Sequence, residues 1–299
     1  MFQYNLYSFL KERYPDTKIK ADVRWFYTED EHHGFELNRI FANVEGSGYS
    51  LDIASAREIY SVTGQIPTLL KGNAGRLVRR LTSPVNRWLK KSGRTAGRKV
   101  IWDQLEKRFE YDDLCNLDTN KDHFIFGYFV EEAFYRDRID KIKKELKFPP
   151  MSGENAKIVD KMEHEESVSV HVRRGDYLSA TYSGKFLCLG IDYYEQAVKI
   201  VKEHLSNPVF YFFSEDPAYI EEAFSWLPDK IIVNINTGDD SYRDMQLMSK
   251  CKANIIANST FSQLASILND NPGHITVYPA KYMAGEDTEV RTMPGWIRV

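Results

Sequence analysis

The sequence predicts an α/β protein whose second half forms a parallel β-sheet. Between residues 167 and 279, short apolar runs alternate with helical patterns of about 10–14 residues, which is typical of strands joined by helical crossovers. Hydrophobic residues make up 42% of the 299 positions and charged residues 28%, as expected of a globular protein that buries a core. A polar, turn-rich stretch, MSGENAK, separates this regular half from a less regular first half.

We therefore expect two domains, residues 1–155 and 156–299. The first domain begins with an amphipathic helix over residues 4–14. At helical spacing, the first segment of the chain places Phe2, Leu6, Phe9 and Leu10 on one apolar face. A strand over residues 124–129 and a charged helix that ends before Pro149 follow later in this domain.

Residues 71–99 form a strongly basic insertion in the first domain, with ten Lys or Arg residues and no acidic one. Near-helical spacing relates four apolar residues, Leu77, Leu81, Val85 and Trp88. Pro84 should break or kink a helix here. Two interpretations stay open: a solvated basic hairpin, or a patch that rests on anionic lipid headgroups. Nucleic acid is not expected as a partner, because few aromatic residues are interleaved and the net charge of the chain is −3.

The cysteine pattern is typical of a reducing compartment. Cys115, Cys188 and Cys251 are scattered and form neither a CxxC motif nor a Cys/His cluster, so a zinc site is not expected. No run approaches about 18 consecutive apolar residues, and the N-terminus lacks a basic-then-apolar signal pattern. We therefore expect a cytoplasmic protein without a transmembrane helix.

The regular half of the chain contains five predicted strands and four predicted helices. The strands cover residues 167–172, 208–214, 230–235, 253–257 and 275–279, and the helices cover 192–205, 217–227, 241–251 and 259–270. In open parallel sheets, ligands bind beyond the carboxyl ends of the strands. The residues that follow each strand are therefore the candidates for a functional site.

Polar and charged residues gather at these strand ends. They are His171, Arg173, Arg174 and Asp176 after the first strand, Ser214, Glu215 and Asp216 after the second, Asn234 and Asn236 after the third, and Asn258, Ser259, Thr260 and Ser262 after the fourth. Two adjacent arginines repel each other unless an anion or a carboxylate lies nearby, and a helix N-terminus offers free N–H groups to an anion. We infer a site for the pyrophosphate of a nucleotide, in which Arg173 forks onto a phosphate and Asp176 holds an arginine in place.

Purely structural roles for these stretches are the alternatives to this interpretation. The HVRRGDY stretch is also compatible with a structural ion-pair cluster, and NSTFS with an ordinary helix cap. The chain has no GxxxxGK[ST] motif, no GxGxxG after a strand and no Asp-x-Asp pair. P-loop chemistry and a metal-bridged diphosphate are therefore not expected. Arginines and a helix dipole would replace the metal, so we expect neither a metal nor a cofactor.

Four stretches together closely resemble glycosyltransferase family 11, the α-1,2-fucosyltransferases that include bacterial members. They are FGYFVEEAFYRD, HVRRGDY, FFSEDP and DMQLMSKCKANIIANSTFS, in this order over roughly residues 120–280. The resemblance implies a GT-B-like fold of two Rossmann-type domains and an inverting, metal-independent transfer. It also implies GDP-β-L-fucose as donor and the 2-hydroxyl of a terminal β-galactoside as acceptor. The first domain would lie on the acceptor side, and the second would bind the GDP-sugar.

The resemblance also implies roles for individual residues. Arg173 resembles the essential arginine that grips the β-phosphate, and Asp244 resembles the acidic residue that reads the guanine edge. Asp176 is the orienter of an arginine or, as an alternative, the general base. The remaining residues expected to contact the donor are His171, Arg174, Asn258, Ser259, Thr260, Phe261 and Ser262.

Two departures from the family pattern bear on function. The chain starts at MFQYN and lacks the first strand and the Gly-rich GLGNQ turn of the family. Gln263 and Leu264 replace two tryptophans after NSTFS. Three hypotheses follow: an active fucosyltransferase that builds a bacterial O-antigen or capsule, an enzyme that uses another nucleotide sugar, and a non-catalytic GDP- or glycan-binding relative. A lipid-linked acceptor and a peripheral position on the inner face of the bacterial membrane would fit the basic insertion.

Overall fold

The computed structural model describes residues 1–28, 35–66, 70, 72–91, 99–103, 109–178, 186–283 and 293–299. The chain forms two compact units, Met1–Pro149 and Pro150–Val299. Each unit contains helices and a parallel sheet, so the predicted α/β class is confirmed. The predicted domain boundary between residues 155 and 156 falls inside α8 (Gly153–His164), because the polar MSGENAK stretch leads into a helix rather than a linker.

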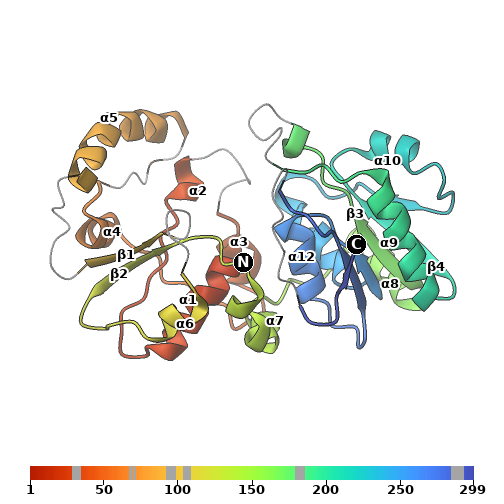
Figure 1. Ribbon diagram of the computed structural model, residues 1–299, viewed down its shortest axis with the longest axis horizontal. Helices are drawn as coiled ribbons and strands as arrows, with labels where there is room; N and C mark the ends of the chain where they lie inside the picture. Colours follow the sequence, from red (N-terminus) through yellow and green to blue (C-terminus); the bar gives the residue numbers. More distant parts are fainter. Residues whose placement is uncertain are drawn as a thin grey trace. The chain divides into compact units, whose positions relative to one another are not determined.

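The first unit is mainly helical around a small sheet (Figure 1). Its elements are α1 (Phe2–Arg13), α2 (Trp25–Thr28), α3 (Leu37–Phe41), α4 (Ala56–Thr63), α5 (Gly72–Lys91), β1 (Lys99–Asp103), α6 (Tyr111–Cys115), β2 (Asp122–Phe126), two 3-10 turns (Glu132–Phe134 and Arg136–Arg138) and α7 (Ile139–Glu145). β1 pairs in parallel with β2, with Ile101 opposite Phe124. The predicted strand over 124–129 is thus displaced, because Phe129 has a left-handed φ of 56° that a strand does not allow.

The first helix is confirmed, but it is not amphipathic. Polar as well as apolar positions of α1 are buried, including Asn5 and Ser8. Arg138 explains this, since its Nε donates to Asn5 Oδ1 (3.1 Å) and its Nη2 donates to Ser8 Oγ (3.0 Å). Arg138 also pairs with Glu12 one turn further along. The polar face of α1 therefore packs against a guanidinium group instead of facing water.

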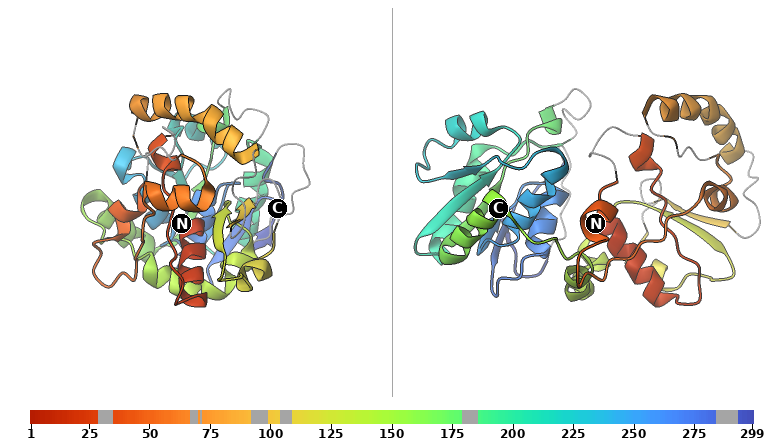
Figure 2. Two further views of the ribbon diagram at one scale, coloured as in Figure 1. Left: turned by 90° about the vertical axis from the view of Figure 1, so that its left-hand side faces the viewer. Right: turned by 180° about the vertical axis from the view of Figure 1, so that it is seen from behind.

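The basic insertion forms a helix rather than a hairpin. α5 runs through Pro84 without interruption, and its ribbon bends along its length (Figures 1 and 2). A proline inside a helix removes one backbone hydrogen bond and crowds the preceding turn, which bends the helix. Of the two predicted outcomes, the break at Pro84 is therefore not found, and the bend of the helix is compatible with the kink. Residues 71 and 92–98 of the insertion lie outside the described residues.

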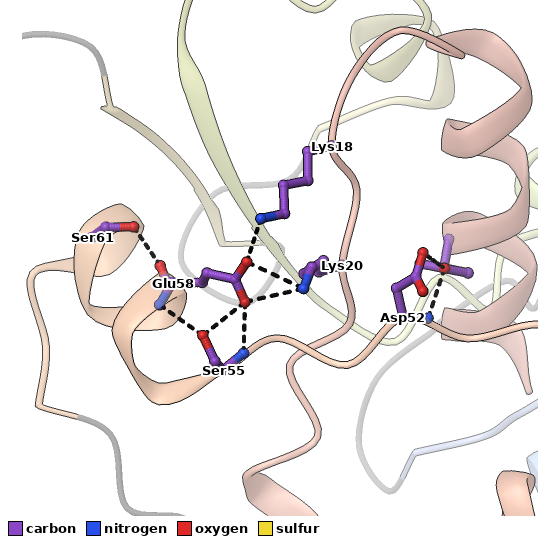
Figure 3. Close-up of polar contacts among 7 residues, drawn as sticks. Lys18, Lys20, Asp52, Ser55, Glu58 and Ser61 are labelled. Carbon is purple, nitrogen blue, oxygen red and sulfur yellow. Dashed lines mark hydrogen bonds and ion pairs between the residues drawn. The ribbon is translucent and has the colours of Figure 1, made fainter.

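α4 has a complete set of end signals. Ser55 Oγ accepts from the backbone N–H of Glu58 (3.3 Å), and the Glu58 carboxylate accepts from the backbone N–H of Ser55 (2.9 Å). Lys18 and Lys20 also approach this carboxylate, at 2.5 and 3.1 Å (Figure 3). The hydrogen bond from Lys18 is the largest cause that holds the pKa of Glu58 well below its usual range. The capping box starts α4, and the two lysine contacts of Glu58 tie this helix to the segment that follows α1.

The second unit carries the regular alternation that the sequence predicts. After α8 come β3 (Glu166–His171), α9 (Ile191–His204), β4 (Pro208–Phe213), α10 (Pro217–Ala223), β5 (Ile231–Val233), α11 (Tyr242–Met248), β6 (Ala253–Ile255), α12 (Thr260–Ile267), β7 (Ile275–Tyr278) and β8 (Ile297–Arg298). The six strands are parallel in the order β5-β4-β3-β6-β7-β8. Counted from β3 this is 3-2-1-4-5-6, the order of a Rossmann-type sheet, so this part of the predicted GT-B-like fold is confirmed.

Helices cover both faces of this sheet. α9 lies on one side, whereas α8, α11 and α12 pack together on the other (Figures 1 and 2). Val168 and Val170 of β3 face the apolar core that includes α9. Ser167 and Ser169, which alternate with these valines, face the opposite layer and are equally buried. There, Ser169 Oγ accepts from Asn254 Nδ2 at 2.7 Å. The Ser/Val alternation of β3 therefore reflects two buried faces, one apolar and one polar, rather than a solvated side.

No helix in the part of the chain that the structure describes is both long and apolar enough to cross a membrane.

Replacing Ser55 by Ala should lower the free energy of unfolding by about 1 kcal/mol, because the N-cap acceptor of α4 is lost. Urea unfolding followed by circular dichroism measures this change. Ser61→Ala is the matched control on the same helix, since Ser61 Oγ only donates to the carbonyl of Glu58. Equal losses in the two variants would contradict the role assigned to the cap.

Candidate functional site

The candidate site lies at the carboxyl edge of the second unit's sheet, where β3 and β6 are neighbours. Val170 is in register with Ile255, although these strands are first and fourth along the unit. From this point the chain continues to β4 on one side and to β7 on the other. Such a switch point separates the loops that follow the two strands and leaves room for a ligand. The structure therefore brings the HVRRGDY and NSTFS stretches to one edge, as predicted.

A hydrogen bond joins these two stretches. His171 Nδ1 lies 2.9 Å from Ser262 Oγ, and this hydroxyl also accepts from the backbone N–H of Ala257 (3.2 Å). The ring of Phe261 packs against His171 with centroids 5.7 Å apart. Burial, and secondarily the charge of Arg173, lowers the pKa of His171 to about 3. His171 is therefore neutral at physiological pH and acts as a tie between β3 and α12.

Asn258 holds two further segments at the same edge. Its Nδ2 donates to the carbonyls of Leu187 (2.7 Å) and Tyr282 (2.8 Å). The hydroxyl of Tyr177 donates in turn to the carbonyl of Asn258 at 2.7 Å. The amide group of Asn258 is thus engaged with backbone atoms, and its side chain is 2% exposed.

The helix that starts within NSTFS exposes one of its hydroxyls. Ser259 caps α12, its Oγ accepting from the backbone N–H of Phe261 (3.3 Å). Ser262 is fully buried, whereas Thr260 is exposed in the first turn. The first turn of an eight-residue helix also presents backbone N–H groups that have no partner within the helix. Thr260 and these N–H groups are the donors that an anion can reach.

The two arginines are neutralised by carboxylates of the neighbouring strand. Arg173 forms an ion pair with Glu215, and Arg174 Nε lies 3.4 Å from Asp216 Oδ2. The guanidinium of Arg174 also stacks over Tyr219, 3.6 Å from the ring centroid. Glu215 and Asp216 follow β4, which pairs with β3 along its length. The repulsion between adjacent arginines is therefore offset by the protein itself.

The Arg173–Glu215 pair lies at the surface, where the Glu215 side chain is 45% exposed. Exposed ion pairs contribute only about 0–1 kcal/mol, so an incoming anion can replace the carboxylate at small cost. Asp176, the residue predicted to hold an arginine, starts a short 3-10 turn (Asp176–Leu178). Its side chain lies outside the described residues, and both roles considered for it stay predictions.

Asp244 belongs to a second polar cluster along the same edge. Asn236, just after β5, donates to Asp244 Oδ1 at 2.7 Å. Asn236 and Asn155 of α8 exchange two amide hydrogen bonds of 2.8 and 2.9 Å. Burial raises the pKa of Asp244 to about 7, against the opposing effect of the Asn236 hydrogen bond. Among the described residues, no cationic side chain pairs with Asp244, so its acceptor capacity is partly unused.

Several partners in the site carry no local signal in the sequence. Tyr219 becomes relevant only because β4 lies beside β3, and Asn155 only because α8 packs against α11 and β3 and brings it to Asn236. The two positions that depart from the family pattern, Gln263 and Leu264, are buried in α12. Gln263 Oε1 accepts from the hydroxyl of Tyr282 at 3.4 Å. The departure therefore alters the packing below the edge rather than an exposed surface.

The first unit contains a cavity of about 190 Å³ that is lined by Tyr4, Tyr7, Ser8, Lys11, Glu12, Gly48, Ser50, Lys141 and Glu145. Its charged groups already pair with one another: Lys141 contacts both Glu12 and Glu145, and Ser8 Oγ donates to Glu145 Oε1 (2.8 Å). No predicted site residue lines this cavity. Within the described ranges, no group of three or more His, Cys, Asp or Glu residues is arranged to hold a metal ion.

A family model described as glycosyl transferase family 11 matches residues 102–299. The chain is 33% identical over 199 residues to the O-antigen biosynthesis glycosyltransferase WbnK of Escherichia coli, a match that covers 64% of this chain and 66% of that protein. It is 31% identical over 189 residues to an Escherichia coli alpha-1,2-colitosyltransferase, covering 60% and 64%. With galactoside alpha-(1,2)-fucosyltransferase 2 of Rattus norvegicus it shares 26% identity over 194 residues, covering 59% and 54%. The matched part thus spans less than two thirds of each relative's length.

Among solved structures, the chain is similar to the fucosyltransferase NodZ from Bradyrhizobium. The TM-score is 0.46 at 17% identity, and the match covers 91% of this chain and 93% of that one. A structure of NodZ alpha-1,6-fucosyltransferase soaked with GDP-fucose matches with a TM-score of 0.45 at 16% identity, covering 88% and 87%.

Replacing Asp244 by Asn should stabilise the protein at neutral pH. The folded state holds the proton of Asp244 up to about pH 7, whereas an unfolded aspartate releases it near pH 4. The wild-type protein therefore loses stability as pH rises through this window, by on the order of 1–4 kcal/mol in total. Asp244→Asn should match the wild-type protein near pH 4 and exceed it at pH 7.

Urea unfolding at several pH values measures this difference. Asp229→Asn, in the exposed turn before β5, is the matched control and should leave the stability unchanged. An Asp244→Asn variant with the same stability as the wild-type protein at pH 7 would show that burial does not penalise this carboxylate.

Proposed function

Because the chain belongs to glycosyl transferase family 11, we propose that it transfers L-fucose from GDP-β-L-fucose to the 2-hydroxyl of a terminal β-galactoside. The transfer would invert the anomeric centre and need neither metal nor cofactor. The acceptor would be part of a bacterial surface glycan. The relatives support this assignment, because one is named for O-antigen biosynthesis and another for galactoside alpha-(1,2)-fucosyl transfer.

The proposal rests on one observation: Arg173, whose exposed carboxylate partner can be replaced, and the N-terminus of α12 lie at the same edge of the sheet, at the switch point. Cleavage of the fucose–phosphate bond leaves a GDP group with additional negative charge. Arg173 would leave Glu215 and bind the β-phosphate, while Thr260 and the backbone N–H groups of α12 donate to the same diphosphate. Once the donor is bound, these groups would be in place before the charge develops, which would lower the barrier to bond cleavage.

Asp244 would recognise the guanine base. An ionised carboxylate can accept from the N1–H and the N2 amino group of guanine at the same time. Asn236 holds one carboxylate oxygen of Asp244, and Asn155 holds Asn236. β5 lies two strands from β3, which corresponds to about 10 Å at the usual strand spacing. This distance leaves room for a ribose between the base and the diphosphate.

The other residues predicted to bind the GDP-sugar would hold the site in shape rather than contact the sugar nucleotide. His171 and Ser262 keep β3 and α12 together, and Asn258 holds two loops at the edge. Arg174 is held by Asp216 and by the face of Tyr219. Ser259 caps α12 and Phe261 covers His171. Asp176 is proposed to orient an arginine, with general-base catalysis as its alternative role.

A second nucleotide sugar is the alternative donor. The relative with 31% identity is named as an alpha-1,2-colitosyltransferase, so a related protein carries a different sugar. The replacement of two family tryptophans by Gln263 and Leu264 alters the packing beneath the phosphate edge. A non-catalytic relative that binds GDP or glycan is the third candidate, and GDP binding without transfer would distinguish it from the other two.

A transfer assay decides between these candidates. The protein is incubated with GDP-fucose, a β-galactoside and EDTA, and the product is analysed by mass spectrometry. A mass increase of one deoxyhexose is the expected result. Transfer from GDP-colitose alone would favour the second donor, and GDP binding without any transfer would favour the non-catalytic relative. Activity that appears only when Mg²⁺ or Mn²⁺ is added would contradict metal independence.

Arg173→Ala should reduce transfer on the order of 10²–10³-fold, because the main cation of the leaving diphosphate is removed. Initial rates at saturating donor measure the loss, and thermal unfolding checks that the fold is intact. Arg298→Ala, on the edge strand β8, is the matched control and should keep the wild-type rate. Retained activity in Arg173→Ala would remove this residue from the phosphate site.

A further inference from the structure

α5 has its apolar face turned outward. Leu77, Leu81 and Val85 are spaced four residues apart, so they lie along one side of the helix. Their side chains are 59%, 67% and 45% exposed. A surface helix normally buries such a stripe against the core and presents polar residues to water. The three aliphatic side chains therefore form a surface, here called the α5 ridge, that is unusual for a helix of a globular protein.

The opposite side of α5 faces the protein. Gly75 is buried, and Val78, Arg79 and Thr82 are half-buried, so these positions mark the inner side of the helix. α5 contacts α2 and lies on the outside of the first unit (Figures 1 and 2). The α5 ridge thus lies on the side of the helix opposite these buried and half-buried positions. Leu70, just before the helix, is also 52% exposed.

The segment of the sequence that contains this ridge carries charge of a single sign. Residues 71–99 contain ten Lys or Arg residues and no acidic residue. Because the whole chain has a net charge of −3, the remaining residues carry a net charge of −13. The exposed Arg80 lies three residues after Leu77 and directly before Leu81. A cationic patch that interrupts an otherwise acidic protein is a localised feature, rather than a consequence of overall composition.

We propose that the α5 ridge docks on an anionic lipid bilayer. The helix would lie in the plane of the membrane, with Leu77, Leu81 and Val85 inserted at the boundary between headgroups and acyl chains. Arg80, which is exposed beside the ridge, would bind a lipid phosphate with its aliphatic stem along the same boundary, and the basic charge of residues 71–99 would strengthen the attraction to an anionic surface. This inference does not depend on the proposed glycosyl transfer, because it rests on residues of the first unit alone.

An anionic bilayer fits these residues better than the other occupants. A nucleic-acid backbone would satisfy the cations but would offer no apolar surface for three branched or long aliphatic side chains. A second copy of this chain would place two basic helices against each other and bring like charges together. A lipid surface provides both an apolar layer and negative charge within the width of one helix.

The test is co-sedimentation of the full chain with vesicles of phosphatidylcholine, alone or mixed with phosphatidylglycerol. We expect the wild-type protein to bind the anionic vesicles at least about tenfold more tightly than the neutral ones, and to be released by high salt. Leu77→Gln/Leu81→Gln should lose binding to the anionic vesicles. Arg80→Glu should weaken this binding but keep the apolar ridge. Tyr60→Gln is the matched control, since Tyr60 is 50% exposed on α4.

Thermal unfolding of each variant checks the fold, and exposed positions should tolerate these replacements. Absence of wild-type binding to anionic vesicles at low salt would overturn the proposal. Binding that is equal for neutral vesicles, or unchanged in both the Leu77→Gln/Leu81→Gln and the Arg80→Glu variants, would also overturn it. A dimer in sedimentation velocity that the leucine variant abolishes, without vesicle binding, would assign the ridge to a second copy. Retention on DNA or RNA without vesicle binding would assign the patch to nucleic acid.

Discussion

The pairing of β3 with β6 is the contact on which the candidate site depends. These strands are separated by 85 residues at the Ser169–Asn254 hydrogen bond, yet they are neighbours at the centre of the sheet. The pairing is reinforced on its buried polar face, where Asn269 Nδ2 donates to Asn254 Oδ1 (2.9 Å). Buried amide networks of this kind are costly when one partner is missing, so they favour a single register. With the register set, the arginine stretch and the α12 N-terminus must start from the same edge.

The positive charges of the two arginines at this edge are neutralised by carboxylates that stay exposed to solvent. Glu215 and Asp216 occupy the positions that anions would take beside the two arginines, but their side chains stay 45% and 39% exposed. The arginines are therefore oriented in the free protein and still available for exchange. Both guanidinium groups lie over an aromatic ring, but Arg174 is 3.6 Å from the centroid of Tyr219, whereas Arg173 is 5.8 Å from the centroid of Tyr177 and so makes the weaker ring contact. The two adjacent arginines thus have different freedom to bind a ligand.

Asp244, in contrast to the two arginines, is a partly buried ionisable group without a partner of opposite charge among the described residues. Its carboxylate is held by amides and lacks a cationic partner among the described residues, and its raised pKa means that ionisation at neutral pH works against folding. A group that costs stability in the free protein is retained more readily where it binds a ligand. In the proposed function, guanine would supply N–H donors in addition to that of Asn236. The same burial that destabilises Asp244 would strengthen its hydrogen bonds to a base.

The sequence by itself determined the local order of the second unit and the chemistry of its strand ends. Periodicity reports which residues are buried, and capping residues report where helices begin, because both depend on neighbours along the chain. It was less informative for the basic insertion, where a hairpin was considered and α5 is a helix, and for residues 153–164, which form α8. In α5 the apolar residues do recur at helical spacing, but Pro84 argued against a continuous helix, and the residues that form α8 are mostly polar and turn-rich at their start.

Tertiary structure alone decided the order of the strands, and with it the partners of each charged residue. Glu215 reaches Arg173 only because β4 lies beside β3, and Ser262 is buried while Thr260 is exposed only because α12 packs against this sheet. The outward direction of the α5 ridge is likewise set by which side of the helix meets the first unit. The local sequence determines which side of a helix or strand is apolar. Which element packs on that side depends on residues far away in the chain.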